Sequence, residues 1–243
     1  MSIRSRVIQK VAPDLHRAAP GLNAGFVHHT VQRAIHGSGV LPPAASAAEK
    51  QLEEQEGMVD QAIHEIIENH VALAAAQGFL TNLGGIATAA VAIPANITGL
   101  AVLQVRMVAA IAHLRGYDLD DPRVRNALLL CVLGEDTVKG LVKKRKVPGT
   151  PMLLATAPAH DPELDTLMAA EFTSALVGRV MGRRAASTVV RRVPVAGGVW
   201  GAGTDAYATW QVGKFTAREL KPRPVPGTPA VQGKQRRWSR AGR

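Results

Sequence analysis

The feature that most constrains how this chain can fold is a stretch without ions. From Val71 to Val105, 35 consecutive residues carry no charged side chain. Pro94 lies within this stretch, and a proline inside a helix removes one backbone donor and clashes with the preceding turn. We therefore expect a short helix over about 86–93 and a longer one over about 95–114, which meet at a kink or tight turn.

Small residues dominate the same stretch and allow helix backbones to approach closely. Two adjacent glycines, Gly84 and Gly85, break it early, so the expected structure is a central, Gly/Ala-rich helical hairpin. About 20 apolar residues span a bilayer core, so the length alone would suffice for a membrane segment. Burying Asn96 and Thr98 in lipid would, however, cost several kcal/mol. We favour a buried hairpin, and shallow or reversible insertion of residues 83–105 stays open as the alternative.

Composition and periodicity point to an all-α fold. Apolar residues make up 47% of the 243 residues but aromatic residues only 4%, which favours close-packed helices over an aromatic-rich β-sandwich. No segment shows sustained alternation with period two, so we expect a multi-helix bundle with little or no sheet. The single cysteine, Cys131, excludes an intramolecular disulfide and favours a reducing compartment.

The net charge of +10 is unevenly distributed. Residues 214–243 hold nine Lys or Arg and one acid, which leaves 20 bases and 18 acids for residues 1–213. The predicted organisation is therefore an N-terminal amphipathic helix and linker over 1–43, a helical domain over 44–220, and a disordered basic tail over 221–243.

Helix start and stop signals divide the domain. Residues 44–77 read as one long helix, interrupted at most by Gly57. Gly116 is a natural helix stop, and Tyr117 is expected to anchor the turn that follows. Asp121 and Pro122 form a strong start signal for a helix that ends near residue 133.

The second half of the domain shows the same kinds of helix start and stop signals. Asp161 and Pro162 begin a long helix that reaches about residue 193. Pro194 ends that helix and precedes the last one, where Gly197 and Gly201 lie four apart on one face and favour tight helix packing.

The order of motifs in residues 78–134 resembles the EcsC family of bacterial proteins. The matching segments are Gly78–Thr81, Gly84–Thr88, Ile93–Ala95, Leu103–Arg106, Ile111–Leu114, Gly116–Pro122 and Leu130–Gly134, together with Val193–Gly198 further on. The resemblance implies a helical, membrane-associated protein of no settled activity, and it supplies no catalytic residues. An acid near Asn96 and an asparagine near Asp205 would be expected of that family, and both are missing.

No pattern for a cofactor or metal is legible. Gly201–Ala206 matches a loose dinucleotide pattern but lacks the preceding strand. Glu56, Asp60, His64 and Glu68 recur every four residues, on one face of the expected long helix. The Glu-x-x-His spacing of helical di-iron sites and the His-Glu-x-x-His motif are both absent. We expect no cofactor and no metal, and a solvated acidic face.

Two groups of basic residues have two readings. They are Arg183, Arg184, Arg191 and Arg192 in the second long helix, and Lys143, Lys144, Arg145 and Lys146 before Pro148. The first reading is intramolecular pairing of the arginines with the acidic helix face. The second is contact with anionic lipid headgroups, where each base contributes about 1 kcal/mol.

An acidic turn offers the only candidates for catalysis. Asp118 and Asp120 lie beside His113, while capping explains Asp121. No spacing of nucleophile, base and acid is legible among them. A pocket mouth beside the apolar hairpin is the functional reading of this cluster.

Three functions follow from these features. The favoured one is a non-enzymatic, membrane-peripheral protein at the inner face of the cell membrane, which binds anionic lipid or a membrane protein partner. The alternatives are a hydrolase or lipid-modifying enzyme with a site near Asp118 and Asp120, and non-specific nucleic-acid binding through the tail, since the near-neutral body argues against a specific reader. Oligomeric state does not follow from the sequence.

Overall fold

The computed structural model describes residues 24–39, 41–83, 89–190 and 194–223, and it describes side chains there except at Ala24 and over 80–98 and 180–202. Within these ranges the chain forms helices and no strand, apart from an isolated bridge between Ser38 and Leu41. The expectation of an all-α bundle is confirmed. The helices are α2 (Ala24–His36), α3 (Ala44–Glu54), α4 (Val59–Leu83), α5 (Ala89–Leu114), α6 (Pro122–Leu133), α7 (Glu135–Lys143), α8 (Pro151–Ala155), α9 (Pro162–Val190) and α10 (Pro194–Glu219).

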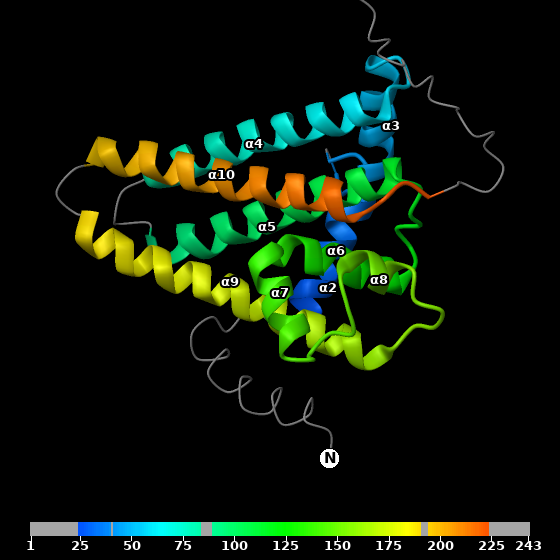
Figure 1. The fold of residues 1–243 in the computed structure, drawn as a ribbon. Helices are drawn as coiled ribbons and strands as arrows, with labels where there is room; N and C mark the ends of the chain where they lie inside the picture. Colours follow the sequence, from blue (N-terminus) through cyan, green and yellow to red (C-terminus); the bar gives the residue numbers. More distant parts are fainter. Residues whose placement is uncertain (1–23, 40, 84–88, 191–193, 224–243) are drawn as a thin grey trace, which may run out of the picture.

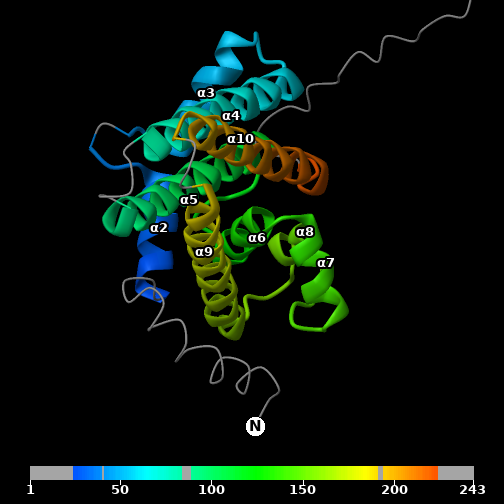
Figure 2. The same ribbon diagram turned by 90° about the vertical axis from the view of Figure 1, so that its left-hand side faces the viewer.

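The described molecule has two parts, one formed by four long helices and the other by several short helices. The helices α4, α5, α9 and α10 extend to one end, at the left of Figure 1, and the short helices pack around their other ends. Figure 2 looks onto the end that the long helices share, with α4 and α10 above α5 and α9. We call it the long-helix end and define it by Leu83, Ala89, Val190 and Pro194, the four helix termini that meet there.

Close approaches between the long helices depend on glycine. A Cβ atom on Gly213 of α10 would lie 2.8 Å from Cγ1 of Ile67 on α4. A Cβ atom on Gly99 of α5 would meet the side-chain amide of Gln77 on α4, a flexible group that can move aside. The helices α4 and α5 form a helical hairpin, but its two helices are not the pair expected on either side of Pro94.

The turn of this hairpin is not at Pro94, and that expectation is wrong. The helix α5 runs through Pro94 without interruption and begins five residues earlier, at Ala89. Near the start of a helix a proline removes a single hydrogen bond, which the rest of the helix outweighs. The chain reverses between Leu83 and Ala89 instead. Gly84 and Gly85 lie there, outside the described residues.

The predicted long helix over 44–77 is broken where Gly57 allowed a break. The helix α3 ends at Glu54, and Glu56 and Gly57 take positive φ values of 52° and 80° before α4 begins. Glu56 therefore lies in a turn and does not share a helix face with Asp60, His64 and Glu68. Asp60, His64 and Glu68 remain exposed on one face of α4, so the expected acidic face loses only Glu56.

The residues of α2 fall within the expected N-terminal helix and linker, but α2 belongs to the core. Its buried side chains recur at helical spacing, and the helix packs against α5 and α9. These side chains are Val27, Val31, Ala34 and Ile35. The amphipathic helix expected before the linker, at the N-terminal end of residues 1–43, falls within residues 1–23, which lie outside the described part of the chain.

Candidate functional site

The turn between α5 and α6 is built as the sequence indicates. Gly116 has φ 81°, its N–H donates to the carbonyl of His113, and the N–H of Tyr117 donates to the carbonyl of Ala112. This pair of bonds is the Schellman arrangement that ends a helix at a glycine. Tyr117 is buried, and its hydroxyl donates to the carbonyl oxygen of Lys221 at 3.0 Å. Tyr117 anchors the turn as predicted.

The anchored partner is the beginning of the predicted tail. The backbone N–H of Arg223 donates to the carbonyl of Arg115 at 2.8 Å. The guanidinium of Arg223 lies 5.4 Å from the centroid of the Tyr117 ring, within range of a cation–π contact. The first three residues of that tail are thus fastened to the body, and residues 224–243 lie outside the described part of the chain.

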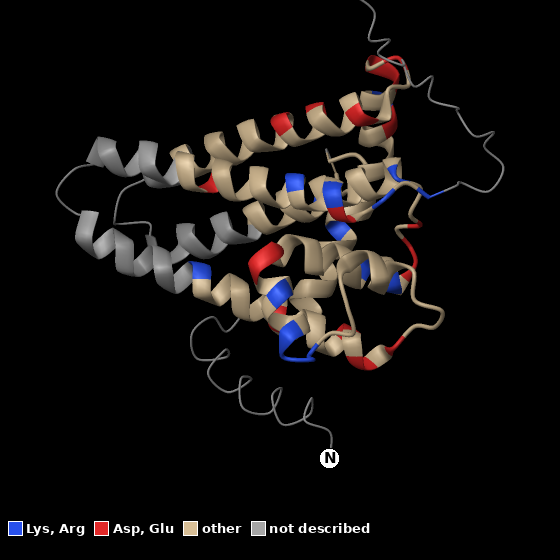
Figure 3. Cartoon of the chain, in the orientation of Figure 1, with Lys and Arg blue, Asp and Glu red and all other residues tan. Residues whose placement is uncertain are grey.

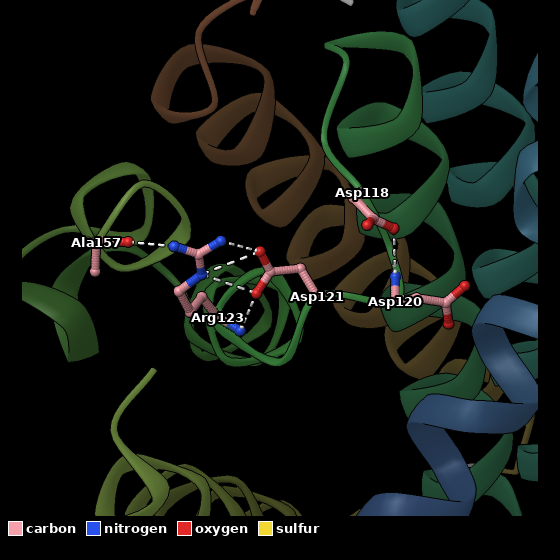
Figure 4. A network of polar contacts seen from close by, with 5 residues as sticks. All are labelled: Asp118, Asp120, Asp121, Arg123 and Ala157. Atoms are coloured by element: carbon pink, nitrogen blue, oxygen red, sulfur yellow. Dashed lines mark hydrogen bonds and ion pairs between the residues drawn. The ribbon is translucent and has the colours of Figure 1, made fainter. Parts of the chain in front are cut away.

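Asp121 caps α6 and holds Arg123 in place. Its Oδ1 accepts the backbone N–H of Arg123 at 2.8 Å, and both carboxylate oxygens accept from the Arg123 guanidinium (Figure 4). The same guanidinium donates from Nη1 to the carbonyl of Ala157, two residues after α8, at 2.5 Å. The side-chain hydrogen bond from Arg123 lowers the pKa of Asp121 below its ordinary value. Asp121 and Arg123 together therefore join α6 to the residues that follow α8, and their role is structural.

The other two acids of the turn are also occupied by neighbours. Oδ1 of Asp118 accepts the backbone N–H of Asp120 at 2.9 Å. Asp120 Oδ1 lies 3.0 Å from Nη2 of Arg125 and 3.4 Å from Nε2 of His36. Figure 4 shows Asp118 and Asp120 apart from the Asp121–Arg123 pair.

His113 does not join these acids. Its Nε2 lies 3.0 Å from Oε1 of Glu49 on α3. The wide, open depression beside the turn, about 500 Å³ in volume, is lined by Asp118, Asp120, Asp121, Pro122, Arg123, Pro158 and His160. His113 is not among them, so the three candidate catalytic residues do not come together.

A histidine that the sequence reading missed lies at the same edge. His160 Nε2 is 3.1 Å from Oδ2 of Asp165, whose Oδ1 accepts from the amide of Asn126 at 2.7 Å. Nδ1 of His160 is buried without a protein partner, next to a cavity of about 30 Å³, which is about the volume of one water molecule. The start signal Asp161–Pro162 was legible nearby, but nothing in the sequence linked Asn126 to Asp165.

No metal centre forms in the described part of the chain. Groups of three or more His, Cys, Asp or Glu side chains arranged to hold an ion are absent there. Cys131 is fully buried, and burial raises the pKa of its thiol to about 12. A thiol so protected from ionisation is not a nucleophile at neutral pH.

Three of the four basic residues at the end of α7 and in the following loop are exposed, and the fourth forms an ion pair. Lys143, Lys144 and Arg145 are exposed, whereas Nζ of Lys146 lies 2.6 Å from Oε1 of Glu171 on α9. This loop belongs to the part of the molecule built from short helices (Figure 3). It is therefore remote from the long-helix end.

The four arginines of the other basic group follow α9 toward the long-helix end. Arg183 and Arg184 lie on α9, while Arg191 and Arg192 fall between α9 and α10, outside the described residues. Nη1 of Arg179, one turn before Arg183, donates to Oε1 of Gln104 on α5 at 3.0 Å.

One of the acids that the arginines were expected to pair with has another partner. The carboxylate of Asp60, one member of the expected acidic face, lies 3.1 Å from the guanidinium of Arg115. That contact is at the start of α4, opposite the long-helix end, so it involves none of the α9 arginines.

The long-helix end is otherwise free of ions along three helices. The second half of α4 from Val71, the first part of α5 up to Val105, and α10 before Asp205 carry no charged residue. Gly197 and Gly201 lie in this part of α10, and Pro94 in this part of α5. Among the described residues, no helix is long and apolar enough to cross a bilayer.

Fold and site together define the class of this protein. It is an all-helical bundle in which the described polar side chains hold elements together and form no recognisable catalytic set. The sequence matches the family model of the EcsC protein family over residues 5–224, so the chain belongs to that family. No curated protein and no solved structure matches the chain. The matched region begins well before residue 44 and includes α2.

Proposed function

We propose that this protein is a peripheral membrane protein that binds anionic bilayers through its long-helix end. One observation carries the proposal. The ion-free segments of α4, α5 and α10 gather at the same end of the bundle as the arginine-bearing part of α9. An apolar surface bordered by bases is the combination that attracts a protein to an anionic lipid–water interface.

The distribution of charge supports this orientation. The charged side chains of α4 lie in its first half, and the first charged residue of α5 is Arg106. Contact through the opposite end would place the acids of α3 and of the α5–α6 turn against anionic headgroups, where like charges repel. The long-helix end is thus the electrostatically favoured side.

The arginines limit how deep this end can go. An arginine at the centre of a bilayer costs about 3 kcal/mol even on the most permissive scale. Arg183 and Arg184 lie in the last part of α9, and Arg191 and Arg192 follow it in the sequence. Headgroup contact is therefore favoured over insertion of the whole long-helix end into the bilayer. This agrees with a peripheral association in which each arginine near the surface contributes about 1 kcal/mol.

Flotation with vesicles tests the proposal. The full chain is expected to float with phosphatidylglycerol–phosphatidylcholine vesicles at low salt and to stay behind with pure phosphatidylcholine. High salt should weaken the binding, because screening reduces the attraction. Deletion of residues 224–243 should weaken binding without abolishing it. Absence of flotation with the anionic vesicles, or equal flotation with neutral ones, would contradict the proposal.

Charge reversals locate the binding surface. The double variant Arg183→Glu and Arg184→Glu removes two attractions of about 1 kcal/mol each, so binding should fall by at least about 30-fold. The matched control is Lys143→Glu with Lys144→Glu, which makes the same change of charge on the loop after α7. If the loop variant loses more affinity than the α9 variant, the long-helix end is not the binding surface.

A further inference from the structure

The outer face of α10 carries an exposed aromatic pair that neither capping nor core packing explains. Tyr207 is 60% exposed and Trp210 is 39% exposed. Their rings stack with centroids 6.1 Å apart and planes inclined by 19°. With aromatic residues at only 4% of the chain, two of them stacked in contact with solvent indicate a surface that something else covers.

A basic residue lies on the same stripe of the helix. Lys214 follows Tyr207 and Trp210 at spacings of seven and four, so the three project from one face of α10. Lys214 is exposed, and no ion pair of its side chain occurs among the residues that the structure describes.

On the neighbouring helix, α4, the exposed side chains change in polarity at the level of the aromatic pair. Figure 1 shows α4 and α10 side by side and antiparallel, and Ile67 meets Gly213 at their contact. Six residues further toward the long-helix end, Leu73 of α4 reaches the level of Tyr207. Leu73 is 55% exposed and Phe79, beyond it, is 40% exposed, whereas the exposed residue next to Ile67 is Glu68. Exposed side chains of α4 thus change from acidic to apolar where the aromatic pair of α10 begins.

We infer that the outer face of α10 extends the bilayer contact of the long-helix end along this helix, with Tyr207 and Trp210 in the lipid–water interface and Lys214 against the anionic headgroups. This inference rests on the proposed function and specifies the face that makes the contact. Tyr and Trp suit this position because each has an apolar body and a polar tip. The nearby base supplies charge complementarity to acidic lipid.

A second copy of the chain is the competing occupant of this face. If two copies associated through this face, the aromatic pair would be buried in the dimer interface, and the dimer would form without lipid. A bilayer contact instead leaves the protein's oligomeric state in solution unchanged by substitutions of the pair. The two occupants therefore give different results in the same set of variants.

The test compares substitutions at equally exposed positions. Tyr207→Ser with Trp210→Ser should lower partitioning into phosphatidylglycerol–phosphatidylcholine vesicles by at least about tenfold, since interfacial aromatic residues supply much of such binding. The matched control is Leu153→Ser on α8, because Leu153 is also 60% exposed but lies on the short-helix part of the molecule (Figure 1). That variant should bind like the unmodified chain, and circular dichroism checks that every variant is folded.

A labelling experiment gives a second readout that does not depend on affinity. Cys131 is buried and its thiol pKa is raised to about 12, so a cysteine introduced by Tyr207→Cys can be labelled selectively with an environment-sensitive fluorophore. Vesicles should shift its emission to the blue and make it accessible to lipid-borne quenchers. The same label introduced by Leu153→Cys should show neither effect.

The outcomes separate this inference from the function on which it rests. If the unmodified chain does not bind anionic vesicles, the proposed function fails. If it binds, but the aromatic variant binds equally well and the label at position 207 remains in water, this inference fails while the proposed function stands. A dimer in the absence of lipid that the aromatic substitutions dissociate would also overturn it.

Discussion

The hydroxyl of Tyr117 donates a hydrogen bond of 3.0 Å to the carbonyl oxygen of Lys221, 104 positions further along the chain. This bond fastens the residues after α10 to the turn between α5 and α6. Removing this hydrogen bond of a buried tyrosine by Tyr117→Phe should lower the free energy of unfolding by about 1 kcal/mol. Urea denaturation measures the change.

Tyr207→Phe is the control for that substitution. Tyr207 is exposed, and its ring can keep its stacking on Trp210 without the hydroxyl. Its effect should stay within about 0.5 kcal/mol. Equal losses in the two variants would mean that the Lys221 contact does not stabilise the fold.

Gly213→Ala tests the close approach of α10 to α4. The added methyl would lie 2.8 Å from one carbon of Ile67 and 3.0 Å from a second. Because Ile67 is buried and β-branched, relief requires a backbone shift, and the expected loss is about 1–3 kcal/mol. On the same helix, a Cβ atom at Gly203 would meet nothing within 4 Å. Gly203→Ala should therefore stabilise by about 0.5–1 kcal/mol, and thermal melts compare the two.

Asp121→Ala removes both the cap of α6 and the partner of Arg123. Loss of an N-cap acceptor costs about 1 kcal/mol at neutral pH. The pKa of Asp121 is lowered in the fold, chiefly by its side-chain hydrogen bond from Arg123. Its stabilisation is thus fully present above the unfolded carboxyl pKa of about 3.9 and is lost as the pH falls through the lower folded value.

The pH series gives this prediction its control. The difference in unfolding free energy between the unmodified chain and Asp121→Ala should shrink as the pH falls below about 3.9. Asp118→Asn keeps an acceptor for the N–H of Asp120 and should change stability little at any pH. A stability difference for Asp121→Ala that stays constant through the acidic range would contradict the role of the charged carboxylate.

The accuracy of the sequence reading followed the range of the interactions involved. The start of α6 was predicted to the residue, because Asp121 and Pro122 act on amides within their own first turn. The end of α5 at Gly116 was predicted for the same reason. Pro94 misled because its effect depends on where the helix begins, and the packing of α4 against α5 sets that start.

The contents of the site were less predictable than the helices. Asn126 and Asp165 are 39 positions apart and meet only because α6 packs on α9. The exposure of Tyr207 and Trp210 was equally hidden, since large aromatic residues at helical spacing are more often core residues. The sequence carries no signal of which face of α10 meets α4, and that face decides which aromatic side chains remain in solvent.

A buried polar chain across three long helices offers the last test. Gln104 of α5 donates from Nε2 to Oγ1 of Thr209 on α10 at 3.1 Å, and its Oε1 accepts from Arg179 of α9. Gln104 and Thr209 are both fully buried. Thr209→Val keeps the shape but leaves an amide donor without its partner, so the loss should be about 1–3 kcal/mol. Urea denaturation measures it.

A double-mutant cycle decides whether the bond itself is responsible. Gln104→Met removes the donor, and in that background Thr209→Val should cost much less than in the unmodified chain, because no polar group remains to be stranded there. Thr216→Val is the control on α10, since its buried hydroxyl donates to the carbonyl of Val212 in its own helix and should show no coupling to Gln104. Additive effects of Thr209→Val and Gln104→Met would show that the three helices are held at this level by apolar packing alone.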